Sequence, residues 1–243
     1  MEYEGEYLYN NKYNGKGYDE NGNIIYELIN GNGKVEEYNY RGILIFKGEY
    51  LNGKRNGKGI EFNNLGKIQF EGEYLNGRRI GKGKEYYVWG DLAFEGEYLN
   101  GKRNGKGKEY DEDGELKFEG EYKNCFREGH GIEYKNNGDI FECEFKNDRA
   151  NGYGTIYYKN GDKYEGQFKN GINYGYGTFY SSLGFKYKRF FKNDRYEQFL
   201  YCIVYPKLLF LHDFYLKYDK IIIRVILFII ILIIGYLIKK IIS

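Results

Sequence analysis

The sequence predicts an all-β protein, an elongated antiparallel meander of stacked β-hairpins followed by a C-terminal transmembrane α-helix. Three observations support this fold class. A segment of about 24 residues recurs along the chain, and the 243 residues include 35 Gly, 30 Tyr and 17 Phe with a single Pro. The third is a continuous apolar run near the C-terminus. Because aromatic residues favour strands and Gly, Asn and Asp favour turns, the composition predicts many short strands.

The repeat is clearest in the middle of the chain. Residues 94–110 read FEGEYLNGKRNGKGKEY, and residues 70–86 differ from them at two of seventeen positions. A Gly-x-Gly pair follows in each full unit, and a fixed period of this length is typical of repeat architectures. The aromatic residue that opens each unit falls at Tyr3, Tyr26, Phe46, Phe70, Phe94, Phe118, Phe141 and Tyr164, with Tyr187 as a further candidate.

One unit contains two strands and two turns. Side chains alternate along a strand, so Phe94, Gly96 and Tyr98 are predicted to share one face. The chain then turns through LNGKRNG and returns as GKGKEY. Asp113-Gly114 resembles a two-residue hairpin turn, which closes the unit. Successive units therefore predict a continuous antiparallel meander.

The glycines and the aromatic residues are predicted to form one packing device. A regularly placed strand glycine indicates close approach by a neighbour. We expect each ring to lie over a glycine of the adjacent strand, and the rings to stack from unit to unit. Leu28 and Cys143 stand where their units should have the first glycine, so these two units are expected to pack less regularly.

The pattern aromatic-x-Gly followed by Gly-x-Gly resembles the MORN repeat (membrane occupation and recognition nexus). The resemblance covers residues 3–190 and implies a twisted sheet of stacked hairpins. It suggests an array over residues 1–190, with about eight units of which the second is degenerate. Similar repeats in bacterial antitoxin-like proteins share the N-G-K-x-x-G-K pattern, so the resemblance leaves more than one role open.

Basic residues recur in three successive turns and are predicted to lie along one edge of the sheet. This basic rim could meet anionic lipid headgroups or an acidic protein. The alternative is that these are solvated residues that discourage edge pairing. The predicted rim consists of Lys54, Arg55, Lys58, Arg78, Arg79, Lys82, Lys102, Arg103 and Lys106.

The C-terminal region is predicted to anchor the chain in a lipid bilayer. Residues 221–238, IIIRVILFIIILIIGYLI, are long enough for a spanning helix, and a short tail, 239–243, follows. Arg224 can extend towards the membrane interface. Residues 191–220 are expected to form a cap or an interfacial segment, although the apolar stretch 199–216 could instead be a second membrane segment.

The composition excludes some functions. Residues 1–198 hold 31 Lys and Arg against 33 Asp and Glu, so the soluble part lacks the basic excess of a nucleic-acid binder. His130 and His212 have no sequence-paired nucleophile, and Cys125, Cys143 and Cys202 form no metal-binding pattern. We therefore expect a chain that is not an enzyme, with no catalytic, cofactor-binding or metal site.

Three functions remain. The first is a scaffold or tether, single-pass in the membrane, with a cytosolic repeat domain that binds proteins or a second membrane. The cytosolic placement is expected because the N-terminus does not resemble a signal peptide. The second is direct binding of acidic phospholipid by the basic rim. The third is an immunity-like binder of a single protein.

Overall fold

A computed structural model describes residues 2–192 and 195–202, which form eighteen β-strands. The predicted transmembrane segment 221–238 and most of the predicted cap lie outside these residues. The strands are β1 (Glu2–Leu8), β2 (Asn11–Tyr18), β3 (Ile24–Leu28), β4 (Gly33–Tyr38), β5 (Leu44–Leu51), β6 (Lys54–Phe62), β7 (Ile68–Leu75), β8 (Arg78–Tyr86), β9 (Leu92–Leu99), β10 (Lys102–Tyr110), β11 (Leu116–Lys123), β12 (Phe126–Tyr134), β13 (Ile140–Lys146), β14 (Arg149–Tyr157), β15 (Lys163–Lys169), β16 (Ile172–Tyr180), β17 (Lys186–Lys192) and β18 (Arg195–Cys202).

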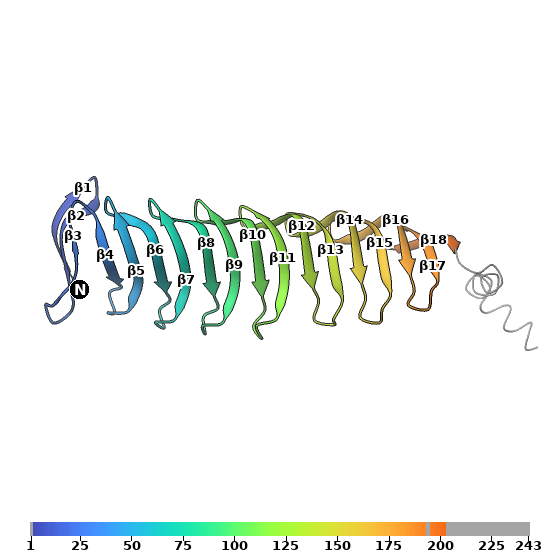
Figure 1. The fold of residues 1–243 in the computed structure, drawn as a ribbon, viewed down its shortest axis with the longest axis horizontal. Helices are drawn as coiled ribbons and strands as arrows, with labels where there is room; N and C mark the ends of the chain where they lie inside the picture. Colours follow the sequence, from blue (N-terminus) through green and yellow to red (C-terminus); the bar gives the residue numbers. More distant parts are fainter. Residues whose placement is uncertain (1, 193–194, 203–243) are drawn as a thin grey trace, which may run out of the picture.

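The strands follow one another along an elongated rod, each antiparallel to the next (Figure 1). Strands β1 to β3 form a three-stranded sheet, and β4 to β18 form a fifteen-stranded sheet in sequence order. This confirms the predicted all-β meander. Sheet pairing extends to Cys202, so the last two strands enter the segment that was assigned to a cap.

Two kinds of connection alternate along the rod. A two-residue turn follows each odd-numbered strand from β5 to β15, with the sequence Asn-Gly after β5, β7, β9 and β15, and in Asn100-Gly101 both residues have positive φ, 51° and 84°. These are the angles of a type I′ turn. A five-residue loop follows each even-numbered strand from β4 to β16 and lies on the lower side of the rod in Figure 1. We call the two sides the turn edge and the long-loop edge.

The prediction for Asp113-Gly114 is therefore wrong. These residues belong to the five-residue loop 111–115, in which the Asp111 amide donates to the Glu115 carbonyl over 3.0 Å. The Asp111 carboxylate accepts from the amides of Asp113 and Glu115. A side chain that organises its own loop allows a longer connection than the Asp-Gly pair alone suggests.

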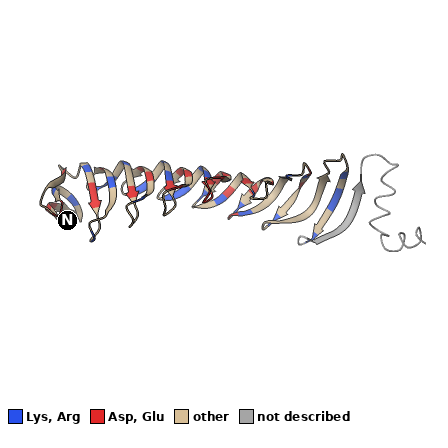
Figure 2. Ribbon diagram, turned by 90° about the horizontal axis from the view of Figure 1, so that it is seen from below, with Lys and Arg blue, Asp and Glu red and all other residues tan. Residues whose placement is uncertain are grey.

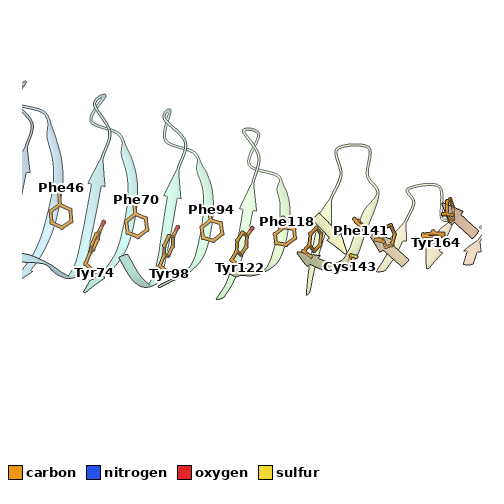
Figure 3. Packing of buried hydrophobic residues seen from close by; sticks show 14 residues of the cluster. Phe46, Phe70, Tyr74, Phe94, Tyr98, Phe118, Tyr122, Phe141, Cys143 and Tyr164 are labelled. Atoms are coloured by element: carbon orange, nitrogen blue, oxygen red, sulfur yellow. The ribbon is translucent and has the colours of Figure 1, made fainter. Parts of the chain in front are cut away.

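The rings lie over the glycines as predicted. A Cβ on Gly83 would lie 2.6 Å from Cζ of Phe70, the ring that opens the same unit. The opening rings Phe46, Phe70, Phe94 and Phe118 are fully buried and lie in line along the rod (Figure 3). The first three meet the Tyr of the next unit edge-to-face, with 5.2 Å between the ring centroids of Phe94 and Tyr122, and Phe118 meets Phe145 in the same way.

The two degenerate units depart from this pattern in different ways. Leu28 lies in β3, where the pairing of the main sheet is interrupted, and it packs with Tyr26 and Val35 in a separate small core. At Cys143 the sheet continues without a break. The buried thiol occupies the glycine position, and the Phe141 and Phe168 rings are tilted by 55° instead of lying edge-to-face.

Among the described residues, the structure contains no helix long and apolar enough to cross a membrane. The predicted anchor at 221–238 therefore stays a prediction from the sequence.

Candidate functional site

The nine residues of the predicted basic rim do not form one row. Strand alternation and the position along each strand distribute them over three places: the turn edge, the aromatic face and the opposite face of the sheet. The three sets differ in exposure and in bonding.

Arg55, Arg79 and Arg103 belong to the aromatic face. The guanidinium of each covers the ring of its own unit, with 4.1 Å from the Arg103 Cζ to the centre of the Phe94 ring. Arg127 does the same over Phe118. This cation–π contact closes the ring face that would otherwise meet water.

The same arginines join carboxylates of neighbouring units into a ladder. Arg103 pairs with Glu85 and also with Glu109, at 3.5 Å to the second. The ladder runs Glu37, Arg55, Glu61, Arg79, Glu85, Arg103, Glu109, Arg127, Glu133. Each side chain in it is at least three-quarters shielded from solvent.

Tyrosines complete the ladder. The hydroxyls of Tyr74 and Tyr98 donate to Glu61 and Glu85 over 2.9 and 2.8 Å. Burial, reinforced by these carboxylates, raises the pKa of both tyrosines well above its usual value. Burial would also raise the pKa of Glu109, but the hydrogen bond and charge of Arg127, together with Tyr122 and Arg103, outweigh it and the pKa is lowered. The ladder is thus a closed network of ion pairs and hydrogen bonds.

The ladder ends where its residue types change together. In the next unit Ala150 takes the place of the arginine and Phe145 that of the tyrosine, and Ile156 then replaces the glutamate. All three belong to the apolar core or pack against it. The unit of β13 and β14 therefore closes the same face with apolar packing, and the ladder runs from β4 to β12.

Lys54, Arg78 and Lys102 lie on the turn edge, each directly after an Asn-Gly turn, and all three are exposed. They are about two strands, or about 10 Å, apart. Among the described residues they form no ion pair. This set is the part of the predicted rim that does lie on one edge.

Lys58, Lys82 and Lys106, which we call the groove lysines, lie on the face opposite the aromatic rings. An open groove of about 1020 Å³ runs along this face from β6 to β12. Its floor is the line of strand glycines, where only backbone separates the groove from the rings. Glutamates of the intervening strands alternate with these lysines, since Lys82 is registered with Glu97. Acidic and basic positions accordingly alternate along the central strands (Figure 2).

The charged groups on the two walls of the groove differ in their hydrogen-bond and ion-pair partners. On the wall away from the groove lysines, tyrosine hydroxyls donate to the carboxylates, with 2.8 Å between Tyr110 and Glu95, and Lys108 lies 3.5 Å from Glu119. Burial and the Glu95 carboxylate raise the pKa of Tyr110 to about 12. Within the described part of the chain the groove lysines form no close ion pair, and each is registered opposite a glutamate of the next strand, Glu73, Glu97 and Glu121.

The groove changes character towards the C-terminus. His130, whose Nε2 lies 3.1 Å from a Glu142 oxygen, continues the line of the groove lysines, and the exposed Tyr153 and Tyr176 follow. The alternating charges are thus a property of the central units.

Sequence reasoning missed the groove and the ladder because it treated the basic segment as a loop. The structure places Lys54 and Arg55 at the start of a strand, where neighbours point to opposite faces. Arg55 lies directly opposite Tyr50 across the hairpin, so the two side chains share the aromatic face. Pairing these two residues in the sequence would have predicted that face for Arg55. Arg127, absent from the predicted rim, follows from the same register.

The described residues contain no cluster of three or more His, Cys, Asp or Glu placed to hold a metal ion.

Comparison with protein-family models matches the MORN repeat six times, at residues 46–64, 70–92, 94–115, 118–140, 142–163 and 164–182. Together these matches cover more than half of the chain. A search of curated proteins finds no match.

Proposed function

The chain belongs to the MORN-repeat family, and from this premise we propose that it is a non-enzymatic scaffold that holds a protein partner along its groove. MORN repeats are in general modules for interaction with proteins or membranes. The observation that carries the proposal is the contrast between the two faces. The arginine ladder closes the aromatic face, whereas the opposite face is an open groove lined by alternating lysines and glutamates, in which the groove lysines form no close ion pair.

The groove suggests the chemistry of its partner. Lys58, Lys82 and Lys106 recur every two strands, about 10 Å apart. A helix with acidic residues seven positions apart repeats its charges every 10.5 Å, close to this spacing. We therefore propose a partner segment with carboxylates at that interval, held against the glycine floor, where no side chain obstructs its approach.

We further propose that residues 221–238 tether the rod to a membrane. Support for this comes from the sequence, since the run is apolar and of spanning length. A rod fixed at its C-terminal end would hold its partner at a set distance from the bilayer.

The groove is tested by charge reversal in the full chain. Lys58→Glu, Lys82→Glu and Lys106→Glu together should reduce cross-linking to co-purifying protein at least tenfold, because carboxylates would then face carboxylates. The matched control reverses Lys54, Arg78 and Lys102, which lie on the same strands but at the turn edge. Equal loss in both variants, or in neither, would contradict the groove as the binding site.

The tether is tested separately. Removal of residues 217–243 should move the protein from the membrane fraction to the soluble fraction while the circular dichroism of the sheet is retained. Continued sedimentation with membranes would show that the tail is not the anchor.

The exposed turn edge supports a second candidate function, binding of acidic phospholipid. With the ladder arginines engaged inside the sheet, this function rests on Lys54, Arg78 and Lys102. Each basic residue near an anionic surface contributes about 1 kcal/mol. Salt-sensitive binding of the tail-deleted chain to phosphatidylserine vesicles, lost on reversal of these three residues, would support it. Unchanged binding would exclude the turn edge.

A further inference from the structure

The long-loop edge carries a strip of exposed apolar side chains that neither the groove nor the turn edge includes. Tyr40 is 89% exposed, Leu65 71%, Val88 59% and Trp89 47%. They occupy the tips of three successive loops, 39–43, 63–67 and 87–91, each two strands and so about 10 Å from the next. We call these four residues the apolar strip.

The loops that carry the strip are held in place. The Asn63 side-chain oxygen accepts from the amides of Leu65 and Lys67, at 2.9 and 3.1 Å. Its amide nitrogen donates to the carbonyl of Val88, 3.0 Å away in the next loop. Asn39 organises its own loop in the same way. The side chains are therefore presented by rigid loops, so their exposure is not a consequence of loose backbone.

The aromatic members of the strip are also supported. The Trp89 ring stacks on Tyr87, with 5.0 Å between centroids and 9° between planes, and the Tyr87 hydroxyl donates to the Tyr110 carbonyl over 2.8 Å. The Arg41 guanidinium lies 5.3 Å from the centre of the Tyr40 ring. Trp and Tyr with a neighbouring cation are the residues enriched at the interface between lipid and water.

Acidic loops limit the strip at both ends. Loop 19–23 contains Asp19 and Glu20, and loop 111–115 contains four carboxylates. Two copies paired antiparallel along this edge would bring these acidic loops together, which disfavours a homodimer. The same carboxylates would be repelled by an anionic bilayer, whereas zwitterionic lipid carries no net charge to oppose them.

We propose that the apolar strip inserts into the interfacial region of a zwitterionic bilayer. Separate apolar tips with amide side chains between them offer no continuous surface to a rigid partner, but a fluid interface can surround each tip. The chain also carries a segment that we propose to span a bilayer, which places lipid within its reach. With the rod parallel to that bilayer the strip would meet the same membrane, and with the rod upright it would meet a second one.

The single tryptophan of the chain, Trp89, reports on the strip directly. In one arm the full chain is reconstituted in vesicles of phosphatidylcholine with brominated tails. In the other, brominated vesicles are added to the full chain in unbrominated vesicles. Insertion quenches Trp89 and shifts its emission to the blue. Quenching in the first arm would show insertion into the membrane that holds the chain, and quenching in the second arm would show insertion into a separate membrane. Absence of quenching in both arms would overturn the proposal.

Variants separate insertion from mere proximity. Tyr40→Ser with Leu65→Ser should weaken lipid quenching of Trp89 about tenfold, as expected for loss of buried apolar area. Leu183→Ser is the matched control, since Leu183 is 81% exposed at the same position of loop 181–185 and should leave quenching unchanged. Replacing half of the lipid with phosphatidylserine should reduce quenching, and an increase would contradict the role of the acidic loops. Because the strip lies outside the groove, these results do not depend on the protein partner.

Discussion

At the scale of single residues, the two positions of each Gly-x-Gly pair require glycine for different reasons. Gly81 has φ +59°, a left-handed conformation at the bulge where two strands change register. Gly83 has ordinary backbone angles, but the Phe70 ring occupies the place of its side chain. The first glycine is therefore required by the backbone and the second by packing.

Substitution of the second glycine tests the packing. Gly83→Ala would place a methyl group 2.6 Å from a fully buried ring that has no room to move. We expect a loss of about 1–3 kcal/mol in the free energy of unfolding, measured by urea titration. Lys82→Ala, one residue away on the groove face, should change it by less than about 0.5 kcal/mol. A Gly83→Ala protein with the same free energy of unfolding as the natural chain would contradict the close contact of ring and glycine.

Residues of the ladder predict a dependence on pH. Hydrogen bonds from arginines hold the pKa of Glu37 and Glu109 below 4.5 in spite of burial. A carboxylate with a lowered pKa stabilises the fold at pH values above its unfolded pKa, and this contribution is lost as the pH falls through the folded value. The protein should thus lose stability below about pH 4.5.

The variant Glu37→Gln with Glu109→Gln isolates this contribution. It should be less stable than the natural chain at pH 7, and the difference should shrink at pH 3.5, measured by urea midpoints. Glu115→Gln, an exposed loop residue, serves as the control and should leave both midpoints unchanged. A difference that stays constant with pH would show that the two carboxylates do not stabilise through their charge.

At the scale of elements, the segment N-G-K-R-N-G is a connector between neighbouring units. The Gly101 amide donates to the carbonyl of Arg79 in the preceding unit over 2.9 Å, and the Gly77 amide donates to Arg55 in the same way. Each turn is therefore fixed to the one before it. This explains why the turn sequence recurs as faithfully as the core residues.

The turn at Asn124-Cys125 departs from the Asn-Gly rule and gives a prediction. Cys125 has φ 75°, a conformation that costs a residue with a side chain about 1–2 kcal/mol. Cys125→Gly should raise the free energy of unfolding by about 0.5–1 kcal/mol, because the gain is partly offset by the greater freedom of glycine in the unfolded chain. A lower urea midpoint would show that the thiol is needed at this turn.

At the scale of the whole molecule, the rod has a discontinuity near its N-terminus. Strands β3 and β4 are not paired in one sheet, and Tyr26, Leu28 and Val35 form a core of their own. In a repeat protein, neighbouring units stabilise one another through the contacts between them. Strands β1 to β3 are therefore coupled to the long sheet by this core, which includes Val35 of β4, and by turn hydrogen bonds such as that from the Gly53 amide to the Gly31 carbonyl, but not by strand pairing.

Hydrogen exchange of the full chain tests this coupling. Amides of β1 to β3 should exchange at least tenfold faster than those of β7 to β11, where pairing is continuous on both sides. Within the long sheet, protection should continue through β13 in spite of Cys143, since pairing there is unbroken. Equal protection of β3 and β8 would contradict a break between the two sheets.

The sequence by itself determined the repeat, the meander and the packing of rings on glycines, because each unit forms the same contacts with its neighbours. The local period therefore carries the fold. Leu28 likewise indicated the irregular unit where the sheet is interrupted.

Only the tertiary structure decided which face each charged residue occupies. A bulge in β6 inserts two residues between the pairs Tyr50–Arg55 and Gly48–Gly59, so Lys58 is registered with Glu73 of the next unit. Three of these residues are close in sequence but lie far apart in the fold: Arg55 covers a ring, Lys54 lies on the turn edge and Lys58 lines the groove. Their separation depends on hydrogen bonds and stacking between units, and the order of basic residues in the sequence does not specify these contacts.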